Sequence, residues 1–252
     1  ATASFDGFVR IFLINFNYDT NTYKHMFQNL TLLTQIPIFE EFTNVDFKPF
    51  KFENNFDNPI NESDKAQLLE KTVLEHRHPN SLVFDPYGRL FIGDSQGSIH
   101  VYEVRIVDSK LICNKIKIIN HKEIIGDNIN NIMIEPKRMR LIIHSRDNCI
   151  RLLDISGNKP RVIIRYFGIK CSKTNIKSCV SPDGNYILSG SEEGKPFLWP
   201  LQSGINLPTD KYEVEFIDSV SDVSWNNCYN MIALSGFGQE YPILVYVHEK
   251  KE

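Results

Sequence analysis

The stretch SPDGNYILSGSEEGKPFLW, residues 181–199, contains two tight turns, and each turn leads into a strand-like segment. The first turn, Pro-Asp-Gly at 182–184, combines a proline that presets φ at one corner with a glycine that accepts the left-handed conformation at the next. The second turn places Gly194 five positions before the bulky residue Trp199. Alternating segments after such turns are typical of antiparallel hairpins, so the stretch predicts strand, turn, strand, turn, strand.

Both turns recur along the chain. The second type is followed five positions later by a bulky residue in SFDGFVRIF (4–12), DSQGSIHVY (94–102), SRDNCIRLL (145–153) and SEEGKPFLW (191–199). The first type, built on proline or asparagine, begins at positions 86, 136, 182 and 226, which are 50, 46 and 44 residues apart. Further β-rich stretches at 115–120, 161–167 and 212–217 link these units. Each unit is therefore predicted to contain four strands.

A repeated four-stranded unit of roughly 40 to 45 residues is the signature of a WD40-type β-propeller. A β-sandwich of short strands is the alternative, but sandwich strands do not recur with the same turn chemistry in the same order. We therefore expect an all-β, WD40-type propeller of four-stranded antiparallel blades across residues 1–252, with about four and a half blades present. An isolated half-ring would expose a sheet edge, so the missing blades are expected upstream of Ala1.

Residues 15–75 interrupt the repeat. Gly7 and Gly97 are 90 positions apart, and no glycine occurs from Phe8 to Tyr87. This gap holds either two blades or one blade with an insertion, and the lack of turn glycines favours a divergent blade with a linker or insertion. The segment 47–63, rich in Phe and Asn, is interpreted as the body of that insertion, either docked on the propeller flank or disordered.

The composition and charge of the chain argue against several other classes of function. The formal net charge of −3 provides no global basic field, so no nucleic-acid partner is expected. No apolar run approaches membrane-spanning length, and no signal peptide opens the chain. The five cysteines form no CxxC pair, which indicates reduced thiols in a cytoplasmic compartment. Without convergent carboxylates, metal-ligand spacing or a cofactor motif, no enzyme activity, catalytic residue, metal or cofactor is expected.

The first unit, TASFDGFVRIF at residues 2–12, resembles the core of a WD40 repeat. In that family a histidine, a serine or threonine, a turn aspartate and a tryptophan form a structural hydrogen-bond network. The resemblance assigns such structural roles to Thr2, Asp6, His76, Ser189 and Trp199, with His78 as an alternative to His76. No unit has the full set, which indicates a divergent propeller. These residues are not read as a catalytic triad, because no nucleophile elbow accompanies them.

Three stretches of the C-terminal half are more distinctive than a general WD40 repeat. They are LIIHSRDNCIRLLDI (141–155), SPDGNYILSGSEEGKPFLW (181–199) and VSDVSWNNCYNMIALSGFGQEYPILVYVH (220–248). In that order they resemble the last three blades of the jouberin family of WD40 proteins. The most specific segments are HSRDNCIRLLD and FGQEYPILVYV.

The resemblance implies a non-enzymatic protein-interaction scaffold at the base of the cilium, in the transition zone or at the basal body. Such a scaffold supports cilium assembly and the gating of ciliary proteins. Its implied partners are other proteins of ciliary-base complexes, and its implied location is cytoplasmic. The alternative is a generic WD40 adaptor, such as a ubiquitin-ligase substrate receptor or a subunit of a chromatin or trafficking complex, because fold does not dictate function.

Partner contacts are expected from turn residues at one rim of the propeller, because loops on a rigid frame carry function. Arg146 and Asp147 lie at such a turn. The last repeat has three extra turn positions before its final strand and contributes Gln239, Glu240 and Tyr241. These five residues are the partner-binding candidates, and the competing interpretation is that each belongs to a solvated turn.

Overall fold

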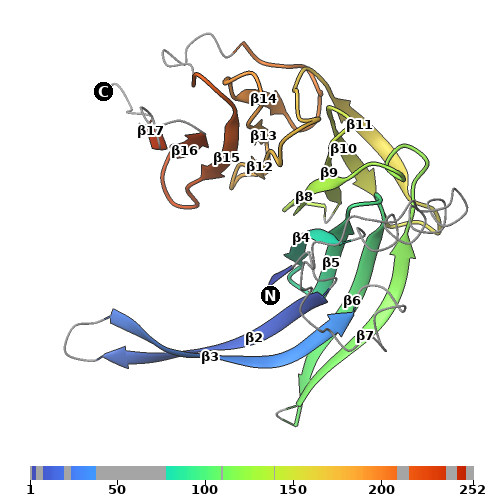
Figure 1. Cartoon of the computed structure of the whole chain (residues 1–252), viewed down its shortest axis with the longest axis vertical. Coiled ribbons are helices and arrows are strands. Elements are labelled where there is room, and N and C mark those ends of the chain that lie inside the picture. Colours follow the sequence, from blue (N-terminus) through green and yellow to red (C-terminus); the bar gives the residue numbers. More distant parts are fainter. Residues whose placement is uncertain are drawn as a thin grey trace, which may run out of the picture. The chain divides into compact units, whose positions relative to one another are not determined.

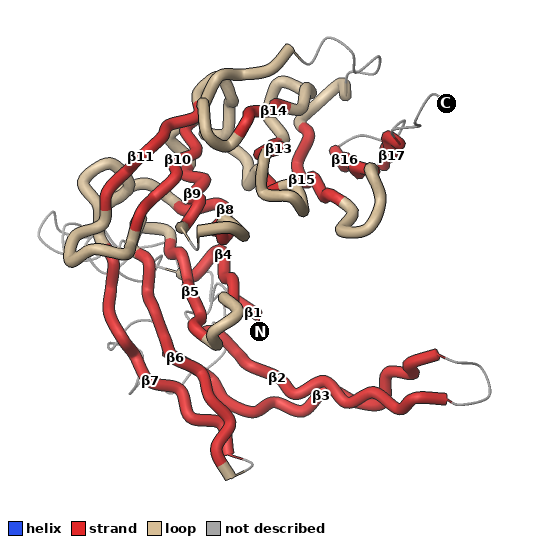
Figure 2. Tube along the Cα trace, turned by 180° about the vertical axis from the view of Figure 1, so that it is seen from behind, coloured by secondary structure: helices blue, strands red, loops and turns tan. Residues whose placement is uncertain are grey.

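A computed structural model describes residues 2–3, 8–19, 24–37, 78–108, 110–138, 140–208, 216–236 and 243–247. These residues form strands, turns and loops, and none of them is helical (Figure 2). No helix within these ranges is therefore long and apolar enough to cross a membrane. The chain divides into two units, residues 1–79 and 80–252, which are described separately.

The first unit contains a three-stranded antiparallel sheet of β1 (Thr2–Ala3), β2 (Phe8–Asp19) and β3 (Lys24–Pro37). Strands β2 and β3 pair along their whole length as a long hairpin (Figure 1). The described part of the predicted 15–75 insertion is thus a pair of strands, and residues 38–77 lie outside the described ranges. The interpretation of this segment as a linker or insertion stays a prediction.

The remaining strands form four antiparallel sheets, each a simple meander in chain order (Figure 1). The second sheet contains β4 (Pro79–Phe84), β5 (Arg89–Asp94), β6 (Ile99–Val107) and β7 (Lys110–Ile119). The third contains β8 (Ile129–Ile134), β9 (Leu141–Ser145), β10 (Cys149–Asp154) and β11 (Arg161–Tyr166). The fourth contains β12 (Ser178–Val180), β13 (Tyr186–Ser189) and β14 (Phe197–Pro200). The fifth contains β15 (Val220–Trp225), β16 (Met231–Gly236) and β17 (Ile243–Val247).

The predicted all-β fold of four-stranded antiparallel sheets is confirmed most completely in the second and third sheets. Their outer strands, β7 and β11, occupy the β-rich stretches expected at 115–120 and 161–167. The outer strand expected at 212–217 falls largely within 209–215, outside the described residues. The upstream blades stay a prediction.

The core of the second unit lies between neighbouring sheets. One apolar cluster joins the second and third sheets, another joins the third and fourth, and a third joins the fourth and fifth. Each inner sheet therefore packs on both of its faces, which explains why all five residues of β9 are buried. The repeated bulky positions of the sequence, Tyr102, Leu153 and Trp199, are all buried in this core.

A buried ion pair lies at the turn between β8 and β9 of the third sheet. Glu135 is fully buried and Arg140 is 8% exposed. The Arg140 guanidinium donates to both carboxylate oxygens of Glu135, from Nε to Oε2 at 2.5 Å and from Nη2 to Oε1 at 2.7 Å. Gln202 Nε2, in the turn after β14, donates to Glu135 Oε1 at 3.3 Å. The hydrogen bond from Gln202 thus joins the turn between β8 and β9 of the third sheet to the turn after β14 of the fourth.

Polar side chains on the first two strands join neighbouring sheets. Asn131 Nδ2, on β8, donates to the Ser178 carbonyl oxygen on β12 at 2.7 Å. Ser81 Oγ, on β4, donates to Asn131 Oδ1 at 3.2 Å. His144 Nδ1, on β9, lies 3.2 Å from Ser178 Oγ, and the His144 ring is fully buried. These bonds continue from sheet to sheet alongside the apolar core.

Burial of His144 predicts a loss of stability in mild acid. Burial, and then the positive charge of Lys177, lowers the pKa of His144 to about 3. The unfolded chain, with a histidine pKa near 6.5, binds the proton more readily, so protonation favours unfolding below that pH. We expect the free energy of unfolding to fall by about 1.4 kcal/mol per pH unit as the pH drops from 6.5 towards 3. Urea unfolding at pH 6.5 and 5.0 measures this slope.

His144→Asn is the matched variant for this measurement. It removes the titrating ring, so its stability should change less between the two pH values, even if it is less stable at both. Equal slopes for the variant and the natural protein would show that His144 does not set the acid sensitivity.

Candidate functional site

The turns between the second and third strands of successive sheets share one rim, termed the BC rim. In each case the loop that leads into the next sheet covers the turn through a backbone N–H donor. These hydrogen bonds run from Gly126 N to Gln96 O (2.8 Å), from Cys171 N to Asn148 Oδ1 (2.8 Å) and from Phe216 N to Gly194 O (3.0 Å). The BC rim is therefore built from two ordered layers, a turn and the loop above it.

The corner residues of these turns explain the repeated glycine of the sequence. Gly97, Asn148 and Gly194 have positive φ values of 78°, 63° and 76°. A Cβ at Gly97 would lie 2.0 Å from the Ile124 carbonyl oxygen, and one at Gly194 would lie 2.1 Å from that of Phe216. A side chain at either glycine would displace the covering loop. In the turn of the third sheet, the side-chain Oδ1 of Asn148 accepts a hydrogen bond from the Cys171 backbone N–H of the covering loop, which is why asparagine occurs there in place of glycine.

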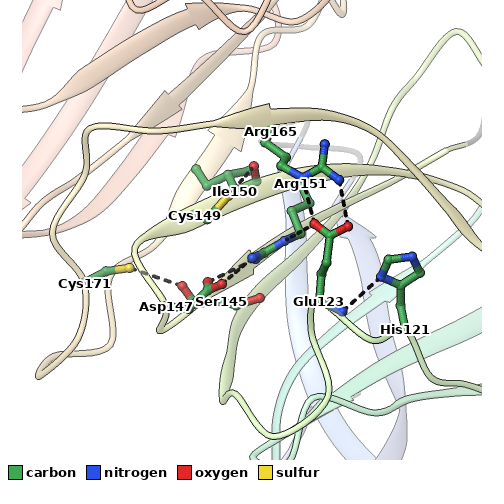
Figure 3. Close-up of polar contacts among 9 residues, drawn as sticks. All are labelled: His121, Glu123, Ser145, Asp147, Cys149, Ile150, Arg151, Arg165 and Cys171. Atoms are coloured by element: carbon green, nitrogen blue, oxygen red, sulfur yellow. Dashed lines mark hydrogen bonds and ion pairs between the residues drawn. The ribbon is translucent and has the colours of Figure 1, made fainter.

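Four charged side chains gather on the BC rim of the third sheet (Figure 3). This rim charge cluster consists of Glu123, Asp147, Arg151 and Arg165. Arg165, on β11, donates from Nε and Nη2 to the two carboxylate oxygens of Glu123, both at 2.7 Å. Arg151, on β10, is only 7% exposed; its Nη1 donates to Asp147 Oδ1 at 3.0 Å, and its Nε lies 3.6 Å from Glu123 Oε2.

Charge alternation stabilises the rim charge cluster. Arg151 and Arg165 are direct cross-strand partners, and like charges in that position repel each other. Glu123 comes from the loop above and contacts both guanidinium groups (Figure 3). The hydrogen bond from Arg165 is the main cause that lowers the pKa of Glu123 to about 2, so this carboxylate stays ionised. The loop is thereby held to the third sheet by charge.

Two thiols lie beside the cluster, and both are poor nucleophiles. Burial raises the pKa of Cys149 to about 11 and that of Cys171 to about 12. Their Sγ atoms donate to the carbonyl oxygens of Ile150 (3.4 Å) and Ser145 (3.2 Å). A thiol is reactive as its thiolate, which is scarce here at neutral pH. Among the described residues no group of His, Cys, Asp and Glu is arranged to hold a metal ion.

The five predicted contact residues fall into three situations. Arg146 lies on the BC rim as expected, and its Nε donates to Asn130 Oδ1 at 3.1 Å. Asp147 also lies there, but its carboxylate is engaged by Arg151, so it helps to hold the rim charge cluster together. The other three predicted residues lie outside the described ranges: Gln239, Glu240 and Tyr241. Their role in partner binding stays a prediction.

Sequence reasoning missed Glu123, Arg151 and Arg165. A signal was available in the strands CIRLLD and RVIIRY, where an arginine interrupts an apolar run. Two such arginines on neighbouring strands require an anion between them, but the sequence does not say which carboxylate supplies it.

The predicted structural residues are only partly visible. Ser189 is buried, and its Oγ donates to the Gly190 carbonyl oxygen at 3.0 Å. Trp199 is buried, and its Nε1 donates to the Phe167 carbonyl oxygen at 3.3 Å. Thr2 is exposed on β1, while Asp6 and His76 lie outside the described ranges. The WD40 network as a whole therefore stays a prediction.

A separate polar network forms around Asp94, at the end of β5. Asp94 Oδ1 accepts from the backbone N–H groups of Gln96 and Ser98, both at 2.9 Å. Asp94 Oδ2 lies 3.0 Å from His100 Nε2, and both side chains are buried. Here a carboxylate and a histidine tie a turn to the following strand.

Comparison with known proteins agrees with this architecture. A family profile described as "WD domain, G-beta repeat" matches residues 167–199, the stretch that ends on Trp199. The chain is 28% identical over 192 residues to jouberin of Rattus norvegicus, which covers 74% of this chain and 18% of jouberin. It is 35% identical over 71 residues to protein lethal(2)denticleless of Drosophila melanogaster, covering 28% of this chain and 9% of that protein.

A solved structure titled "Crystal Structure of Mitotic Checkpoint Complex" contains a chain that superposes with a TM-score of 0.52 at 15% identity. The match covers 92% of this chain and 56% of that one, and it supports the fold alone. With its repeated antiparallel sheets and its WD40 repeat at 167–199, the chain has the fold of a WD40-type β-propeller, and it is similar to jouberin over 74% of its length.

Proposed function

We propose that this chain is the propeller portion of a non-enzymatic protein-interaction scaffold at the base of the cilium. It would act in the transition zone or at the basal body, in cilium assembly and in the gating of ciliary proteins. The similarity to jouberin over 74% of the chain carries this proposal. Because the chain spans 18% of jouberin, location, activity and partners are all part of the proposal.

The rim charge cluster supports the role of an interaction platform. Its loop, turn and strands are held by ion pairs, so polar groups are presented from a rigid frame, and loops on such frames carry recognition. Burial raises the pKa of both thiols beside the cluster, and the described residues include no group of His, Cys, Asp and Glu arranged to hold a metal ion. The chemistry of the cluster suits binding.

The location of the protein in a ciliated cell tests the proposal. The tagged full-length protein, expressed from its own locus, should concentrate at the basal body or transition zone together with a marker of that compartment. Its depletion should reduce the number or length of cilia. A signal spread evenly through the cytosol or nucleus, with normal cilia after depletion, would contradict the ciliary role.

The predicted rim residues define a second test. The combined variant Arg146→Ala, Gln239→Ala, Glu240→Ala and Tyr241→Ala should lose partners in affinity purification without a lower melting temperature. Asp147 is left intact because it holds the buried Arg151. Lys159→Ala with Arg161→Ala is the matched control, since both residues are exposed around the turn between β10 and β11. An interactome unchanged from that of the control would reject these contacts.

The chain is also similar over 71 residues to a protein other than jouberin, lethal(2)denticleless, which favours a generic WD40 adaptor as a second candidate. A ubiquitin-ligase substrate receptor is one example of such an adaptor, because fold does not dictate function. Mass spectrometry of purified complexes separates the two. Ciliary-base proteins support the first proposal, whereas ligase, chromatin or trafficking subunits without ciliary proteins support the second.

A further inference from the structure

A pocket of about 260 Å³ lies between the fourth and fifth sheets. It is formed by the turn that leads into β13 and by the turn that follows β15, and β15 packs against β12 and β13 (Figure 1). Among the residues that line it are Asp183, Tyr186, Trp225 and Tyr229. The turns belong to the opposite edge of the sheets from the BC rim, so the pocket is separate from the rim charge cluster.

Aromatic rings form the walls of this pocket. The rings of Tyr186 and Trp225 are nearly parallel, with 16° between their planes and 6.4 Å between their centroids. Tyr229 is 69% exposed and lines the same pocket from the neighbouring turn. The three rings come from two different sheets, and Trp225 also packs on the apolar core of the fifth sheet. Such rings present negative faces that attract a cation.

One carboxylate supplies the charge of the pocket. Asp183 Oδ1 accepts from Ser181 Oγ at 2.5 Å and from the Asn185 backbone N–H at 3.0 Å, and Oδ2 accepts from Asn185 Nδ2 at 2.6 Å. The bond from Ser181 is the main cause that lowers the pKa of Asp183, so the group is ionised at neutral pH. The positive charge of Lys137 also lowers the pKa of Asp183. The Lys137 ammonium donates a hydrogen bond to Asn185 Oδ1, and Lys137 is not among the residues that line the pocket. The residues that line it include no lysine, arginine or histidine.

We propose that this pocket binds the trimethylammonium group of a trimethylated lysine in a partner protein. Asp183 is already bonded within its own turn, so it attracts a cation without being free to pair closely with N–H donors. An unmodified lysine ammonium or an arginine guanidinium would leave N–H donors without acceptors against the aromatic rings. A quaternary ammonium carries no N–H group and therefore leaves no donor unsatisfied. Recognition of methylated lysine by aromatic faces rests on this chemistry.

A protein segment suits the pocket better than a choline lipid. Asn227 and Asn230 lie in the pocket lining, and their side-chain amides can donate to and accept from a peptide backbone. Asn226 also lines the pocket, but its Oδ1 already accepts from the backbone N–H groups of Cys228 and Tyr229. A phosphocholine headgroup would bring a phosphate close to Asp183, where no basic residue of the lining offsets the repulsion. This inference rests on the pocket alone and is independent of the proposed ciliary location.

Tryptophan fluorescence of the purified chain can measure binding. The protein has two tryptophans, and Trp199 is buried, so quenching by a bound cation reports on Trp225. A peptide with trimethyllysine should bind saturably and about tenfold more tightly than the same peptide with unmodified lysine. It should also bind about tenfold more tightly than a peptide carrying the uncharged tert-butyl analogue of trimethyllysine. Equal affinity for the uncharged analogue would overturn cation recognition, and tighter binding of phosphocholine would overturn the choice of a protein segment.

Variants locate the site. Tyr229→Ala removes an exposed ring and should weaken binding of the trimethyllysine peptide several-fold with an unchanged melting temperature. Asp183→Asn should weaken it as well, and more at low salt. Tyr87→Ala is the matched control, because Tyr87 is 75% exposed on the corresponding turn of the second sheet. No saturable binding by the natural protein, or equal losses in Tyr87→Ala and Tyr229→Ala, would refute the proposal.

Discussion

Glu135→Ala should lower the free energy of unfolding by about 3–5 kcal/mol. The substitution leaves the Arg140 guanidinium, 8% exposed, without the carboxylate that accepts two of its hydrogen bonds. An unpaired buried charge costs far more than the pair contributes. Urea unfolding followed by circular dichroism measures the loss.

The double variant Glu135→Ala with Arg140→Met provides the control. With both charges removed, much of the stability should return, because a methionine can pack where the guanidinium stem lay. If the double variant is as unstable as Glu135→Ala alone, the loss comes from packing around position 135 and the ion-pair explanation fails.

Trp199→Ala should also cost about 3–5 kcal/mol, through the cavity it leaves. The side chain is fully buried in the cluster between the third and fourth sheets. Its ring stacks on Phe197 at 5.7 Å between centroids and meets Tyr166 edge-on at 6.1 Å. Its Nε1 also donates to the Phe167 carbonyl oxygen. The same unfolding measurement tests the structural role predicted for this residue.

Trp199→Phe separates packing from hydrogen bonding. It keeps an aromatic ring in the cluster but loses the bond to Phe167, so we expect a loss clearly smaller than that of Trp199→Ala. If both variants lose equal stability, the hydrogen bond is the dominant contribution and the cavity argument fails.

The repeat could be predicted because its causes are local. A turn corner that needs positive φ selects glycine or asparagine, as at Gly97, Asn148 and Gly194, wherever the chain folds back. A nearly continuous apolar run along the neighbouring strands then marks a sheet buried on both faces, as in β9, where all five residues are buried. The outer strands β7 and β11 therefore lie where the sequence predicted them.

The candidate sites were predicted less completely. Arg146 and Asp147 lie on a rim turn, as expected. The carboxylate of Asp147, however, forms an ion pair with Arg151. Glu123 reaches Arg165 across 42 positions of sequence, and no local pattern shows that contact. The aromatic pocket was missed for the same reason, since Tyr186 and Trp225 come from different repeats.

By itself, the sequence determined the WD40-type repeat, its turns, its all-β character and the resemblance to jouberin, because turn chemistry and strand alternation act over a few residues. Only the tertiary structure decided which charges meet on the BC rim, which carboxylate pairs with the buried Arg140, and which rings face each other between the last two sheets. These contacts depend on how sheets and turns pack, and packing brings together residues that share no local pattern.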